Sequence, residues 1–133
     1  MALKLSVIGV GYLGATHAAC MSSLGFDVTG VDTDQSKVDL LSKGELPFYE
    51  PGLDTLLATE IKTGRLRFTT DFSAIADADI HFICVGTPQS KDGLAADLSY
   101  VMASVAAIAP HLKEGSLVVG KSTVPVGTAQ LLR

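Results

Sequence analysis

A glycine-rich turn between two apolar segments constrains the fold of this chain more than any other feature. The apolar run at residues 4–9 leads directly into Gly9, Gly11 and Gly14, and an alanine-rich helical pattern follows these glycines. Asp32 ends the next apolar run. The order of strand, spaced glycines, helix, strand and acidic residue predicts a binding site for a dinucleotide.

Each part of this motif has a physical role. Gly9 allows a turn that a Cβ atom would obstruct, Gly11 lets the main chain approach a diphosphate, and Gly14 lets the helix pack close to its strand. The free N–H groups and the positive dipole end of the helix face the phosphates. The expected diphosphate-binding turn comprises Gly9, Val10, Gly11, Tyr12, Leu13 and Gly14.

Asp32 is placed to accept hydrogen bonds from the hydroxyls of a ribose. A carboxylate suits a free 2′-hydroxyl and repels a 2′-phosphate, so NAD is expected rather than NADP. Lys37 can either contact the ribose or phosphates or lie solvated at the start of the next helix. Two other interpretations stay open, because the glycines can serve only a tight turn, or the ligand can be another nucleotide such as S-adenosylmethionine.

The rest of the chain alternates strand-like and helix-like patterns. Strands are expected at residues 4–9, 27–32, 65–69, 79–85 and 116–120, and Asp34, Asp71 and Asp97 are expected to cap helices. Pro51 is expected to open the third helix. This alternation predicts a single α/β domain with a doubly wound, Rossmann-like parallel sheet in the strand order 3-2-1-4-5.

Ligands of such a sheet bind at the carboxyl ends of the strands, where the strand order reverses. Loops 9–14, 86–89 and 121–127 are expected to leave that edge together. The second loop can line the ribose next to the nicotinamide, and Ser122 and Thr123 can place hydroxyls near the nicotinamide itself. Serine and threonine are also common turn residues, so a purely structural role for these loops stays equally open.

Composition excludes several classes of function. The chain has 133 residues, a net charge of −4, 47% hydrophobic and 18% charged residues, which argues against disorder and against a basic nucleic-acid-binding face. From the sequence we expect no signal peptide, no membrane span and no metal site. Cys20 and Cys84 are expected to be small buried residues of a protein in a reducing compartment, the cytoplasm.

Six stretches together resemble a known family. They are residues 7–14, 30–32, 46–53, 82–88, 96–101 and 121–128. In this order they resemble the nucleotide-sugar dehydrogenases that oxidise UDP-glucose or GDP-mannose, and the form KSTVPVGT is more similar to the UDP-glucose branch.

The resemblance implies that the C6 alcohol of UDP-glucose is oxidised to a carboxylate in two hydride steps that use two NAD. It implies a catalytic role for Thr123, which would help to position water and handle protons. The NAD contacts it implies are Gly9 to Gly14, Asp32, Lys37, Val85, Gly86, Thr87, Pro88, Ser122, Thr123 and Val124.

The resemblance also implies that this chain is an incomplete NAD-binding domain. The family's catalytic cysteine, its lysine and aspartate, the sixth strand, the central helix and the sugar-nucleotide domain would all lie beyond residue 133. We therefore expect NAD binding without turnover, and a homo-oligomeric full-length enzyme. The alternatives are the cofactor domain of another nucleotide-sugar or hydroxyacid dehydrogenase and a free-standing nucleotide-sensing regulatory module.

Overall fold

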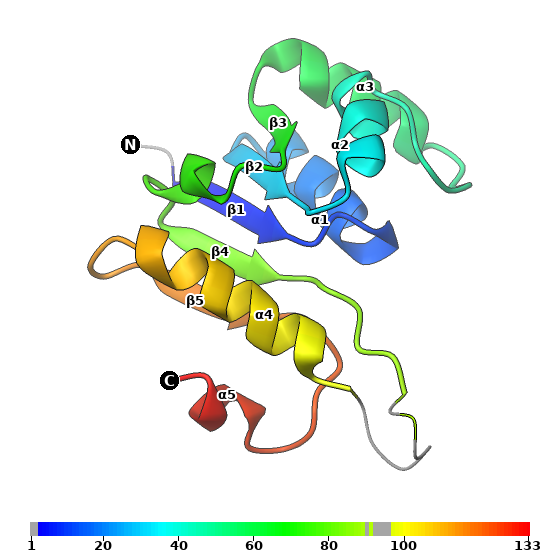
Figure 1. Ribbon diagram of the computed structural model, residues 1–133. Coiled ribbons are helices and arrows are strands. Elements are labelled where there is room, and N and C mark those ends of the chain that lie inside the picture. The colour runs from blue at the N-terminus through cyan, green and yellow to red at the C-terminus, as the bar shows by residue number, and fades with distance from the viewer. Residues whose placement is uncertain (1–2, 90, 92–96) are drawn as a thin grey trace.

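The computed structural model describes residues 3–89, 91 and 97–133. Five strands form one sheet in the order β3-β2-β1-β4-β5, and every neighbouring pair is parallel (Figure 1). The strands are β1 (Lys4–Ile8), β2 (Asp27–Val31), β3 (Leu66–Thr69), β4 (Ile80–Ile83) and β5 (Leu117–Gly120). The predicted doubly wound fold and its strand order are confirmed.

Helices connect the strands on both faces of the sheet. They are α1 (Tyr12–Ser23), α2 (Gln35–Ser42), α3 (Leu53–Thr63), α4 (Ser99–Ile108) and α5 (Thr128–Leu131), with 3₁₀ turns η1 (Phe72–Ile75) and η2 (Ala109–His111). In the described ranges, none of these helices has the length and apolar character that crossing a membrane requires.

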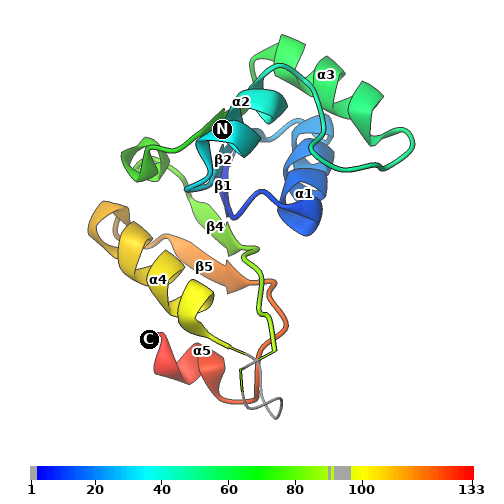
Figure 2. The ribbon, with the colours of Figure 1, turned by 45° about the vertical axis from the view of Figure 1, so that its right-hand side comes forward.

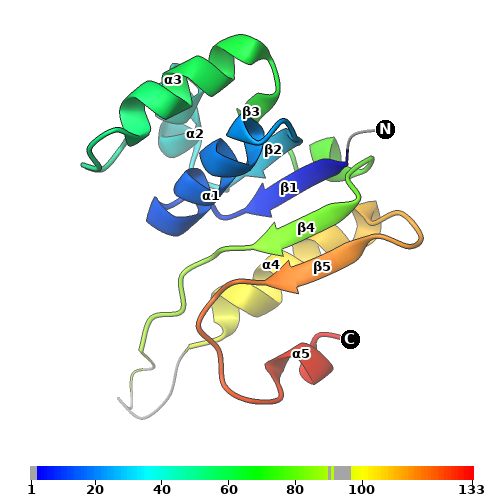
Figure 3. The same cartoon turned by 180° about the vertical axis from the view of Figure 1, so that it is seen from behind.

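The core lies on both faces of β1, because successive side chains of a strand point to opposite sides. Val7 packs in a cluster with Ala15 and Ala18 of α1, whereas Ile8 packs in a second cluster with Ile108 of α4. Figures 1 and 3 show the matching layers, with α1 and α3 on one face and α4 on the other. Figure 2 separates a half containing β2, β3 and α1 to α3 from a half containing β5, α4 and α5.

Asp34 and Asp71 cap helices as predicted, whereas the N-cap of α4 is Leu98 and Asp97 lies one residue before it. The third helix starts later than expected. The carboxylates of Asp34, Asp71 and Asp97 accept hydrogen bonds from backbone N–H groups at the helix starts that follow them. The expectation for Pro51 was wrong, because α3 begins at Leu53. Gly52, its N-cap, has φ of 86°, a left-handed conformation that places one more turn between the proline and the helix.

The two cysteines differ in exposure. Cys84 is buried as expected, whereas Cys20 is exposed, so the expectation for Cys20 was wrong. The sheet-facing side of α1 is filled by Ala15, Ala18 and Ala19, and Cys20 follows where the helix turns toward solvent. A small-residue pattern alone does not show on which side of the helix each residue lies.

Candidate functional site

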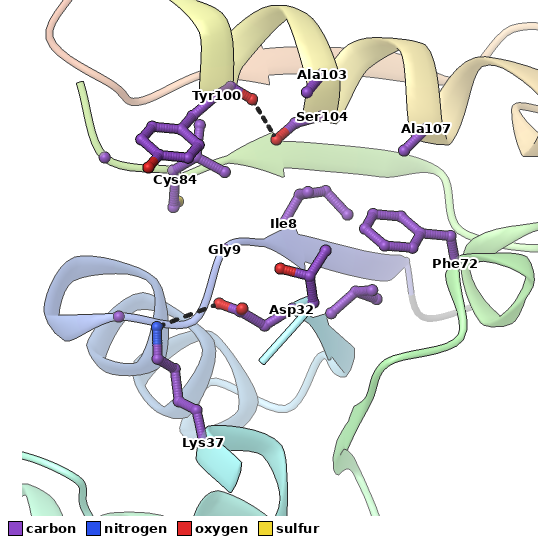
Figure 4. Close-up of a pocket in the computed structure, with 15 residues that line it drawn as sticks. Ile8, Gly9, Asp32, Lys37, Phe72, Cys84, Tyr100, Ala103, Ser104 and Ala107 are labelled. Carbon is purple, nitrogen blue, oxygen red and sulfur yellow. Dashed lines mark hydrogen bonds and ion pairs between the residues drawn. The ribbon is translucent and has the colours of Figure 1, made fainter. Parts of the chain in front are cut away.

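A cavity of about 490 Å³ opens at the carboxyl edge of the sheet, between the glycine turn and α4 (Figure 4). Its volume falls in the range of small-molecule sites. Six residues that the sequence predicted as cofactor contacts line it, namely Gly9, Gly11, Asp32, Lys37, Val85 and Gly86. The cavity lies at the β1–β4 junction, where the strand order reverses and the topology places a ligand.

The glycine turn has the geometry that a diphosphate requires. Gly9 has φ of 90° and donates its N–H to the carbonyl of Val31 at 2.8 Å. A Cβ atom on Gly14 would lie 1.8 Å from the Gly9 carbonyl oxygen, so only glycine allows this packing. A Cβ atom on Gly11 would meet no described atom within 4 Å, which leaves its face of the turn open to a ligand.

The start of α1 supplies free hydrogen-bond donors. The Ala15 N–H is bonded to the carbonyl of Gly11 at 2.9 Å, and the N–H groups before it have no acceptor within the helix. Gly11 is the N-cap and makes no side-chain capping bond. Tyr12 and Leu13 are exposed, so this helix start is accessible. Together with the positive end of the helix dipole, the donors fit an anionic diphosphate.

Asp32 is held in place by main-chain donors. Its Oδ2 accepts from the N–H of Val10 at 2.9 Å, and its Oδ1 accepts from the N–H of Asp34 at 3.0 Å. Lys37 of α2 places Nζ 3.6 Å from Oδ2, as Figure 4 shows. Each carboxylate oxygen keeps a further lone pair, so the oriented group can still accept bonds from ribose hydroxyls.

The sequence reasoning missed the apolar half of the cavity. Val31 is part of this lining, and Phe72 lies across the cavity from Tyr100, Ala103 and Ala107 of α4 (Figure 4). The slot between them suits a flat aromatic base such as adenine. Its signal was present in the sequence, since the three α4 residues recur at helical spacing, but small and apolar residues at that spacing are equally typical of a helix that packs on the core.

Further residues line the cavity or support its wall. The lining also includes Ile8, Thr33, Cys84 and Ser104. The Ser104 hydroxyl donates to the carbonyl of Tyr100 at 2.7 Å within α4. Burial raises the pKa of the Cys84 thiol to about 11, so this cysteine stays protonated and unreactive at neutral pH.

The loops after β4 and β5 are joined but more open. The Ser122 hydroxyl donates to the carbonyl of Val85 at 2.8 Å, so one predicted contact residue holds the loop of another. Thr123 and Val124 are exposed beyond this bond. The cavity lining does not include Thr87, Pro88, Ser122, Thr123 or Val124 among the residues that the structure describes.

Comparison with known proteins gives a consistent family signal. Residues 3–133 match the model of the NAD-binding domain of the UDP-glucose/GDP-mannose dehydrogenase family. The UDP-glucose 6-dehydrogenase of Rhizobium meliloti is 47% identical over 127 residues, which cover 95% of this chain and 29% of that enzyme. The GDP-mannose 6-dehydrogenase of Pseudomonas aeruginosa is 45% identical over 130 residues, which cover 95% of this chain and 30% of that enzyme.

Solved structures agree with the sequence matches. A ternary complex of GDP-mannose dehydrogenase from Pseudomonas aeruginosa superposes with a TM-score of 0.91 at 43% identity, covering 96% of this chain and 30% of that chain. A UDP-glucose dehydrogenase from Pyrobaculum islandicum gives a TM-score of 0.91 at 40% identity, covering 99% of this chain and 32% of that chain. The chain therefore spans about 30% of the length of these relatives.

Proposed function

Since the chain belongs to the UDP-glucose/GDP-mannose dehydrogenase family and corresponds to its NAD-binding domain, we propose that it forms the cofactor site of a UDP-glucose 6-dehydrogenase. The observation that carries the proposal is the fixed carboxylate of Asp32 beside the open glycine turn. The KSTVPVGT sequence at residues 121–128 supports the UDP-glucose branch.

Bound NAD would supply the acceptor for a hydride. The N–H groups at the start of α1 would hold its diphosphate, and Asp32 would accept bonds from the adenosine ribose. The apolar slot between Phe72 and Ala103 would hold the adenine and exclude water from it. The loop that contains Val85 and Gly86 would then line the ribose next to the nicotinamide.

The reaction that we propose for the complete enzyme is oxidation of the C6 alcohol of UDP-glucose to a carboxylate with two NAD. Thr123 would position water and handle protons at the reacting carbon, and the Ser122–Val85 hydrogen bond would hold its loop next to β4. Neither cysteine of this chain suits the thiol nucleophile of that chemistry, because burial raises the pKa of Cys84 to about 11 and Cys20 is not among the residues that line the cavity. We propose a cytoplasmic, homo-oligomeric enzyme.

A second candidate substrate is GDP-mannose. The GDP-mannose 6-dehydrogenase of Pseudomonas aeruginosa is nearly as similar to this chain as the UDP-glucose enzyme of Rhizobium meliloti. The cofactor site would be the same in both cases, so the sugar has to be assigned by experiment.

Two measurements test the proposal. Calorimetric titration of the chain should show NAD binding and weaker NADP binding, and absence of NAD binding would refute the cofactor site. The complete gene product should then form two NADH for each UDP-glucose consumed. One NADH per sugar would contradict the four-electron reaction, and faster turnover of GDP-mannose would assign the other branch.

A further inference from the structure

The segment between α2 and α3 contacts the start of α1. We call residues 45–52, which lie between α2 and α3, the strap (Figure 1). The Tyr12 hydroxyl donates to Oε2 of Glu50 at 2.5 Å. The rings of Tyr12 and Phe48 also meet, with centroids 5.1 Å apart and planes at 48°. Two different contacts therefore join the strap to a single residue of the glycine turn.

The strap is itself fixed to the body of the domain. Phe48 is partly buried and packs against the core cluster that includes Val7 and Ala15. The Glu50 carbonyl accepts from the N–H of Leu53, the first residue of α3. A hydrogen bond to Glu50 consequently fastens the Tyr12 side chain to packed structure, although Tyr12 is 55% exposed.

Tyr12 is also the residue whose main chain opens α1. Its N–H belongs to the first turn, where N–H groups have no acceptor within the helix. The direction of this N–H depends on the orientation of the Tyr12 peptide, which the side-chain contacts with the strap restrain. The hydrogen bond that Tyr12 donates to the Glu50 carboxylate raises the pKa of Tyr12, so the phenol stays a protonated donor at neutral pH.

We propose that Glu50 is a positioning residue for NAD, acting through Tyr12 to hold the diphosphate-binding turn in its binding conformation. The inference rests on the proposed function, because it takes the diphosphate to lie at the start of α1. The bond also occupies the Glu50 carboxylate. If released, this carboxylate would compete with the diphosphate for the positive end of the helix dipole.

Four variants separate this role from a general loss of structure. Tyr12→Phe and Glu50→Ala both remove the hydrogen bond, whereas Glu50→Gln keeps an acceptor oxygen and removes only the charge. Tyr49→Phe is the matched control, because Tyr49 lies in the strap and is 88% exposed. NAD and adenosine are titrated into each purified variant, and thermal melting verifies that each one is folded.

We expect Tyr12→Phe and Glu50→Ala to weaken NAD binding about threefold to tenfold, the range for one lost hydrogen bond. Glu50→Gln and Tyr49→Phe should stay within about twofold of the original chain, since neither loses the bond. Adenosine lacks the diphosphate, so its affinity should be the same in all variants. The double variant Tyr12→Phe/Glu50→Ala should bind NAD no more weakly than the weaker single variant.

Each other result overturns an identifiable part of the inference. If the unmodified chain binds no NAD, the proposed function fails. If it binds NAD and Tyr12→Phe binds equally well, the role of the strap fails while the proposed function stands. Equal losses for NAD and adenosine would show general loosening, and a loss in Glu50→Gln as large as in Glu50→Ala would show that charge, not the hydrogen bond, matters.

Discussion

In the half of the cavity formed by β1 and β2, the turn residue Gly9 and the proposed ribose acceptor Asp32 are held by main-chain hydrogen bonds. In the half formed by β4 and β5, most of the residues proposed to contact NAD lie on exposed loops (Figure 2). The Gly9 N–H donates to the carbonyl of Val31, and the Asp32 carboxylate accepts from the N–H of Val10. Of these four residues, Asp32 is partly buried and the other three are buried. In the other half, Val124 is 39% exposed, and Gly86, Pro88 and Thr123 are exposed as well.

The difference indicates that the two halves have different roles in binding NAD. A group that is already oriented loses little freedom when a ligand binds, so the β1–β2 half should set the affinity for NAD. The loops after β4 and β5 can adapt to the reacting end of the cofactor. The following predictions test this division, from the largest expected effect to the smallest.

Gly14→Ala should remove NAD binding and destabilise the fold. The new Cβ atom would lie 1.8 Å from the carbonyl oxygen of Gly9, so the helix or the turn must move. Overpacking of this kind costs about 1–3 kcal/mol or more of unfolding free energy. Urea denaturation and NAD titration measure the two losses.

Two other glycines serve as controls for Gly14. Gly120→Ala on β5 introduces no contact within 4 Å among described atoms, so stability should change by less than about 1 kcal/mol. Gly11→Ala should keep the fold but should no longer bind NAD, because its Cβ atom would enter the open side of the turn. Unchanged NAD binding in Gly11→Ala would place the diphosphate elsewhere.

Asp32→Ala should weaken NAD binding by about 1–3 kcal/mol, because ribose hydroxyls and the N–H of Val10 lose their acceptor. The preference for NAD over NADP should narrow as well, since the negative charge is gone. Calorimetry measures both affinities, and Asp39→Ala on the exposed side of α2 is the control. Unchanged NAD affinity would remove Asp32 from the site and contradict the division between the two halves.

The β1–β2 half of the site could be predicted from the sequence, because backbone geometry determines which residues can occupy its turn. The roles of Gly9, Gly11 and Gly14 follow from where a Cβ atom fits, and such requirements leave a readable spacing. The strand order followed from the same motif together with the alternation of strands and helices. Asp32 was found because an acid at the end of the second strand has a known place in this topology.

The apolar slot could not be predicted with the same certainty. Phe72 and Ala103 look like core residues in the sequence, because packing and adenine binding both select apolar side chains. Only the three-dimensional structure shows that they face a cavity. The bond from Ser122 to Val85 was also missed, since it joins two loops that are far apart in the sequence.

His81 joins the two halves and should make their connection sensitive to pH. Its Nδ1 lies 2.7 Å from the Ser6 hydroxyl of β1, and the ring is fully buried. Burial, with a smaller contribution from Lys113, lowers the pKa of His81 below its ordinary value of 6.5, whereas Asp79 acts in the opposite direction. The unfolded chain therefore binds more protons, so the free energy of unfolding is highest above pH 6.5 and falls as pH decreases toward the folded pKa.

Denaturation at about pH 7.5 and about pH 5.5 measures this loss. His81→Asn should reduce the difference between the two conditions. The pKa of the partly buried His17 is also lowered by burial, so His81→Asn should remove only part of the pH dependence. An unchanged difference in His81→Asn would show that the β1–β4 junction does not respond to pH.

Lys37→Ala should have the smallest effect and the most specific one. Lys37 lies 3.6 Å from Asp32 with its side chain 29% exposed, so solvent screens the ion pair and NAD affinity should change by less than about 1 kcal/mol. The affinity for NADP should fall further, because its 2′-phosphate would face Asp32 without the neighbouring cation. Titrations at low and high salt test the mechanism, since screening should shrink the extra NADP loss, and Lys37→Arg should retain it as a control. If Lys37→Ala weakens the binding of NAD and NADP equally, Lys37 acts on the diphosphate that both cofactors share. The preference of the β1–β2 half for NAD then depends on Asp32 and not on Lys37 of α2.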